Sequence, residues 1–77
     1  MAADKAAADN IAFGAAMRSE REARGYSQEA IARRVELETS EVEAIERGEG
    51  KVTYLMILRL ARGLGMSPVE LVTRAGL

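Results

Sequence analysis

The chain has 77 residues, a formal net charge of −1, and neither cysteine nor histidine. A chain of this length forms one domain, and its small core favours association with a second copy. The lack of thiols and imidazoles argues against a disulfide framework, a zinc site and a Ser-His or Cys-His nucleophile, so we expect no metal, no cofactor and no enzyme. No apolar run approaches the ~18 residues of a membrane span and the N-terminus lacks a signal-peptide pattern, so we expect a cytoplasmic protein with no membrane partner.

The two signs of charge occupy different parts of the sequence. Arginines are frequent up to residue 34, whereas residues 36–49 hold six glutamates and a single basic residue, Arg47. Phosphate neutralisation supplies much of the affinity of nucleic-acid binders, so the acidic segment is unusual for that class. It leaves open a second role, in which the segment faces a basic protein partner.

Residues 1–9 (MAADKAAAD) contain almost nothing to bury. We expect them to form a flexible N-terminal arm, or a loose extension of the first helix, ahead of a domain at residues 10–77. The first helix is predicted over residues 11–24. Phe13 and Met17 supply its apolar stripe, and Gly25 ends it.

Two short helices follow and are closely joined. Ser27 is suited to cap the first of them, which carries an apolar stripe at Ile31, Ala32 and Val35. The second has Val42 and Ile45 at helical spacing and ends at Gly48. Two helices of this length, joined tightly within a small helical chain, predict a helix-turn-helix unit.

Two further helices complete an all-α prediction with no strand. Thr53 caps the fourth, over residues 54–62, and Ser67, Pro68 and Glu70 give the capping signature of a fifth that runs to about residue 75. The inward face of the fourth helix is expected to hold four apolar residues: Tyr54, Ile57, Leu60 and Ala61.

The paired helices resemble the Cro/lambda-repressor type of helix-turn-helix, the XRE family. The residues that carry the resemblance are Ser27-Gln28-Glu29, Ile31-Ala32, Val42 and Ile45-Glu46-Arg47-Gly48. The resemblance covers roughly residues 13–72. It implies a compact five-helix lambda-repressor-like fold and a sequence-specific DNA-binding transcriptional regulator of the repressor or controller type.

The resemblance also implies roles for individual residues. In this family the residue that opens the second helix touches a DNA phosphate, and the N-terminal part of the third helix meets base edges in the major groove. On this sequence Gln28 stands at the position of the phosphate contact, and the positions implied to face the bases are Thr39, Ser40, Glu43 and Ala44. Arg33, Arg34 and Lys51 are candidates for further phosphate contacts. Arg21 and Glu46 match a buried ion pair of the family.

Two departures from the family pattern concern the turn. Glu36 stands where the family usually has glycine, and Glu38 stands where it usually has a serine cap. Ser40 and Glu43 offer an alternative capping box, which predicts that the third helix starts one or two residues late. The hydroxyls and acids at the base-facing positions can read base edges only to a limited extent.

The fourth helix has more apolar residues than one face needs. Leu55, Met56 and Leu58 extend its apolar surface, and Val72 and Leu77 near the C-terminus can enlarge it. The chain also resembles restriction-modification controller proteins, in its length and in the ILRLA stretch at 57–61, and these dimerise through C-terminal helices.

For the apolar surface, we expect a homodimer that binds a pseudo-palindromic operator in double-stranded DNA, and the alternative is that the surface packs under the N-terminal arm. For the function, the alternative to a DNA-binding regulator is a protein-interaction module of the same fold with weakened DNA binding, such as an antitoxin-like partner of a basic protein.

Overall fold

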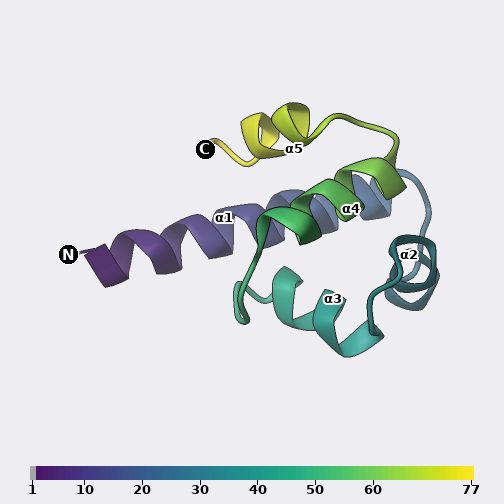
Figure 1. The fold of residues 1–77 in the computed structure, drawn as a ribbon, viewed down its shortest axis with the longest axis horizontal. Helices are drawn as coiled ribbons and strands as arrows, with labels where there is room; N and C mark the ends of the chain where they lie inside the picture. The colour runs from purple at the N-terminus through teal and green to yellow at the C-terminus, as the bar shows by residue number, and fades with distance from the viewer. Residues whose placement is uncertain (1) are drawn as a thin grey trace.

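The computed structural model describes residues 2–77 and contains five α-helices, which confirms the all-α prediction. They are α1 (Ala2–Ala23), α2 (Gln28–Val35), α3 (Thr39–Glu46), α4 (Tyr54–Leu64) and α5 (Pro68–Arg74). In Figure 1, α5 lies on one side of the long helix α1, the α2–α3 pair lies on the other, and α4 crosses in front. None of the helices in residues 2–77 is both long enough and apolar enough to cross a bilayer.

Helix α1 begins well before the predicted start at residue 11. The helix runs from Ala2, so residues 2–9 extend it, while Met1 lies outside the described residues. Alanine has the highest intrinsic helix propensity, which explains why this alanine-rich segment continues the helix. Residues 5–8 are exposed, and the first residue of α1 in the core is Phe13.

The core is formed by all five helices. Its buried members are Phe13, Met17, Ile31, Ala32, Val35, Val42, Ile45, Leu60, Ala61, Leu64 and Leu71. This set includes the apolar stripes predicted for the first three helices. The prediction for Tyr54 is wrong, because its side chain is 72% exposed. Tyr54 is the first residue of α4, where the helix has only begun to pack, and Ile57 one turn later contacts the core.

Two glycines allow helices to approach closely. A Cβ atom on Gly14 of α1 would lie 2.1 Å from the carbonyl oxygen of Ile45 in α3, and one on Gly63 of α4 would lie 2.3 Å from Cγ1 of Val35 in α2. No side chain larger than hydrogen fits at either position without movement of its neighbour. These two glycines therefore fix how α1 sits on α3 and how α4 sits on α2.

The predicted serine and threonine caps are confirmed. Ser27 Oγ accepts from the Ala30 amide at 3.0 Å, and Thr53 Oγ1 accepts from the Met56 amide at 3.2 Å. At α5, Ser67 and Glu70 form the reciprocal capping box that the sequence indicates. Each cap satisfies a backbone donor that has no partner inside its helix.

Candidate nucleic-acid interface

The turn between α2 and α3 keeps a left-handed residue although glycine is absent. Glu36 has φ 60° and ψ 42°, and in residues 2–77 it is the only residue other than glycine with a positive φ. The Leu37 amide donates to the carbonyl of Ala32 at 2.9 Å, which closes the end of α2. The turn therefore has the shape that a glycine would give, and a side chain in this conformation costs about 1 kcal/mol.

The third helix starts earlier than the Ser40–Glu43 capping box predicts, so that prediction is wrong. Glu38 is the N-cap residue, and its amide donates to Oε1 of Glu41 at 2.9 Å. Glu41 lies three residues after the cap, where its carboxylate can reach back to the chain entering the helix. Thr39 and Ser40 consequently occupy the first two positions of α3.

The candidate base-reading residues lie on the side of α3 that does not pack against the core. Val42 and Ile45 are buried, whereas Ser40 is exposed. Thr39, Glu43 and Ala44 are half-buried. Helical spacing places residues 40, 43 and 44 on neighbouring positions of one face.

A buried network holds the end of α3 against α1. Nε of Arg21 donates to Oε2 of Glu46 at 2.7 Å, and Nη2 donates to Oε1 at 3.0 Å. The two side chains are only 10% and 4% exposed. The remaining Nη1 donates to the carbonyl oxygen of Tyr26 at 2.7 Å. The hydrogen bonds to Glu46 raise the pKa of Arg21 above its ordinary value, against the opposing effect of burial.

Gln28 joins the same network. Its Nε2 donates to Oε1 of Glu46 at 3.0 Å, so this carboxylate accepts three hydrogen bonds from two side chains. Gln28 is the first residue of α2 and is half-buried. Glu46 therefore links α1, α2 and α3, and it fixes the amide of the residue that the family resemblance assigns to a DNA phosphate.

The arginines of the first half of the chain have separate roles. Nε of Arg24 donates to the carbonyl oxygen of Leu64, and Nε of Arg34 donates to that of Gly63, at 2.7 and 2.8 Å. These carbonyls belong to the last turn of α4, where helical acceptors lack partners inside the helix. The guanidinium of Arg34 also lies 5.5 Å from the centre of the Tyr26 ring. These contacts are between residues far apart in sequence, so helical patterns contain no signal for them.

Arg33 and Lys51 are placed differently from Arg34. Both side chains are exposed, and no carboxylate of the described residues lies within 4.0 Å of either. Arg33 is on α2, and Lys51 is in the loop between α3 and α4. Unlike Arg34, whose Nε donates to the carbonyl oxygen of Gly63, neither side chain donates a hydrogen bond to another of the described residues.

The candidate dimer residues differ in exposure. Leu55 and Leu77 are 55% and 52% exposed. Leu58 and Val72 are half-buried, and Met56 packs against the core. Three further apolar side chains are exposed in the structure although the sequence analysis did not predict them to be: Ile11, Tyr54 and Val69.

The fold and the paired helices define a DNA-binding regulator of the helix-turn-helix class. The sequence profile of a helix-turn-helix domain matches residues 12–73. The chain therefore belongs to the helix-turn-helix family, and it is a DNA-binding regulator of the XRE type with a lambda-repressor-like fold. Comparison with curated protein sequences gives no significant match.

Several solved structures are similar to this chain. The restriction-modification controller protein C.AhdI from Aeromonas hydrophila is 42% identical, with a TM-score of 0.81 over 83% of this chain and 97% of that one. The clp gene regulator ClgR from Corynebacterium glutamicum is 25% identical, with a TM-score of 0.84 over 88% and 87% of the two chains. The competence regulator ComR from Streptococcus vestibularis is 26% identical, with a TM-score of 0.78, and the match covers 84% of this chain but 22% of ComR.

Proposed function

We propose that the chain is a sequence-specific transcriptional regulator, of the repressor or controller type, that binds a pseudo-palindromic operator as a homodimer. The observation that carries the proposal is the arrangement of α2 and α3. Ser40 is exposed at the start of α3, and Gln28 at the start of α2 is fixed by Glu46. This arrangement can present α3 to base edges while α2 meets the sugar-phosphate backbone.

The acidic segment is compatible with DNA binding because much of its charge has a partner within the protein. Glu46 is paired with Arg21, and the carboxylate of Glu41 accepts from a backbone amide. Glu43 and Glu49 lie 4.0 and 3.4 Å from Arg47. The repulsion that an approaching phosphate meets is therefore smaller than the six glutamates alone indicate.

The phosphate contacts that we propose are Gln28, Arg33 and Lys51. Arg34 has its Nε committed to Gly63, so only its terminal nitrogens remain for an additional contact. The residues that we propose to face the bases are Thr39, Ser40, Glu43 and Ala44. Hydroxyls can donate or accept and a methyl group can meet thymine, so moderate sequence preference is expected from these side chains.

The homodimer is supported by size and by surface. In a 77-residue chain, Leu55 on α4 and Leu77 after α5 remain more than half exposed. Exposed apolar side chains on adjacent C-terminal helices favour a two-fold contact. Such a dimer would set its two recognition helices about 34 Å apart, one turn of DNA.

Selection from a random-sequence DNA pool at two salt concentrations tests the proposal. We expect enrichment of a two-fold-symmetric motif whose affinity falls steeply as salt rises, because phosphate contacts release counterions. A pool that stays unenriched at low salt would contradict sequence-specific binding. That result would favour the alternative of a protein-interaction module.

A further inference from the structure

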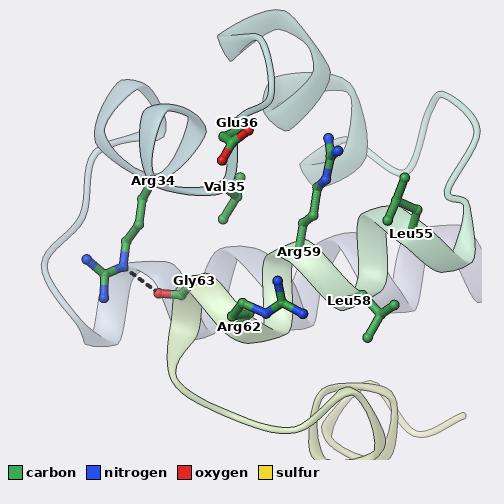
Figure 2. Close-up of a pocket in the computed structure, with 8 residues that line it drawn as sticks. All are labelled: Arg34, Val35, Glu36, Leu55, Leu58, Arg59, Arg62 and Gly63. Atoms are coloured by element: carbon green, nitrogen blue, oxygen red, sulfur yellow. Dashed lines mark hydrogen bonds between the residues drawn. The ribbon is translucent and has the colours of Figure 1, made fainter.

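A groove runs along the outer face of α4 beside the end of α2, and Arg34 is the one candidate DNA contact in its lining. Its volume is about 540 Å³. Figure 2 shows Arg34 at one end, Leu55 and Leu58 at the other, and Arg59 between them. Arg59 and Arg62, which the sequence analysis did not single out, come from α4, and Glu36 is the single acidic residue of the lining.

The groove gathers positive charge that the protein does not neutralise. Among the described residues, no carboxylate lies within 4.0 Å of Arg34, Arg59 or Arg62. The other arginines, apart from Arg33, all have a carboxylate within that distance. In a chain with more acids than bases, three arginines without a carboxylate partner line one concave surface that holds a single carboxylate.

The other end of the groove is apolar. Leu55 is 55% exposed and Leu58 is half-buried. They lie one turn apart on α4, so their side chains form a continuous patch next to Arg59. A ligand that carries only phosphates would gain nothing from this patch, whereas a polypeptide can satisfy both ends.

We propose that this groove docks an acidic amphipathic segment of a partner protein. The carboxylates of the segment would pair with Arg59 and Arg62, because guanidinium groups hold carboxylates through two parallel hydrogen bonds. Apolar side chains one turn along the segment would cover Leu55 and Leu58, as in the packing of an amphipathic helix into a groove. The charge complementarity selects an acidic partner and disfavours a basic one.

The docking site has a consequence for assembly. Leu55 and Leu58 also belong to the surface proposed for the homodimer. A docked segment and a second copy of the chain would therefore compete for the same leucines, and the partner would lower the dimer fraction by mass action. The docking proposal itself does not depend on DNA binding.

The probe is a synthetic helical peptide of about 15 residues with leucines four apart and glutamates on the same face. The control peptide has the glutamates replaced by glutamines. Binding is measured by NMR titration of the intact, isotope-labelled protein, with the wild type compared with the double variant Arg59→Glu, Arg62→Glu. The matched control variant is Arg18→Glu, which changes an exposed arginine on α1 outside the groove.

We expect shifts confined to groove residues, and a loss of affinity of about tenfold or more in the double variant and with the glutamine peptide. The Arg18→Glu protein should bind the acidic peptide like the wild type. Equal binding by the wild type and the double variant, or shifts outside the groove, would overturn the proposal.

If the peptide does not bind and the double variant instead loses DNA affinity, the arginines contact phosphates. If the peptide does not bind and only self-association changes, the groove is a contact between copies; both results also overturn the proposal.

Discussion

Gln28 and Glu46, the first residue of α2 and the last residue of α3, are joined by a 3.0 Å hydrogen bond from the amide to the carboxylate. The same carboxylate is held by the buried guanidinium of Arg21. The two helices of the DNA-binding unit thus share one anchor on α1.

Replacement of Glu46 by glutamine should destabilise the protein by about 3 kcal/mol, because it leaves the charge of Arg21 buried without its partner. Urea denaturation followed by circular dichroism measures the loss. The control is Glu49→Gln, whose carboxylate is 65% exposed in its contact with Arg47 and should change stability by less than about 0.5 kcal/mol. Equal losses of stability in the two variants would show that the buried Arg21–Glu46 pair contributes no more than the exposed one.

Gln28→Ala should weaken DNA binding while it leaves the fold nearly as stable as in the wild type. Loss of its hydrogen bond to Glu46 should lower stability by only about 1 kcal/mol, since both bonds from Arg21 remain. The affinity for operator and for unrelated DNA should fall together, because a phosphate contact carries no sequence information. Fluorescence anisotropy with both DNAs measures this effect. Unchanged affinity would remove Gln28 from the proposed interface.

Gly14→Ala should destabilise the protein by about 1–3 kcal/mol, although alanine favours helices more than glycine does. The added Cβ would lie 2.1 Å from the carbonyl oxygen of Ile45, so α1 and α3 would have to separate. Ser19→Ala, at an exposed position of α1, is the control and should have little effect. A stabilised Gly14→Ala protein would contradict the close contact between these helices.

Glu36→Gly should stabilise the protein by about 0.5–1 kcal/mol, because glycine adopts the left-handed conformation without steric cost. Glu36→Ala should bring no such gain, and the comparison separates backbone strain from loss of the carboxylate. Thermal denaturation of both variants measures the difference. A destabilised glycine variant would indicate that the carboxylate of Glu36 supports the turn.

The ionised carboxylate of Glu20 should contribute to the free energy of unfolding at neutral pH but not in acid. The hydrogen bond from Arg24 holds the pKa of Glu20 below its ordinary value of 4.5, and Arg74 adds to this effect against burial. A carboxylate with a lowered folded-state pKa stabilises the protein above its unfolded pKa, and this stabilisation disappears as pH falls through the folded value. The stability difference between the wild type and Glu20→Gln should therefore be present at pH 7 and vanish in acid. A difference that stays constant with pH would contradict this role.

The sequence predicts helix order well because caps and apolar periodicity are local signals. Ser27, Thr53 and Ser67 mark three helix starts, and the stripes of the first three helices match the core. The start of α3 is not predicted correctly, because the sequence offers Ser40 and Glu43 as a capping box, whereas in the structure the carboxylate of Glu41 accepts from the Glu38 amide.

Most of the other features that the sequence does not reveal depend on contacts between distant parts of the chain. Nothing local to Gly14 marks its approach to Ile45, and nothing local to Arg34 marks its bond to Gly63. Tyr54 continues an apolar stripe, yet it lies beyond the packed part of α4. The proposed DNA contacts follow from the family resemblance, whereas the groove with Arg59 can be recognised only in the folded chain.

In the proposed complex, the exposed start of α3 reads DNA bases. This can be tested by selection from a random DNA pool with the wild type and with Ser40→Ala. We predict that both proteins enrich a symmetric site and that the variant changes the preferred base at one matching position in each half-site. An identical motif from both proteins, enriched to the same degree, would contradict the claim.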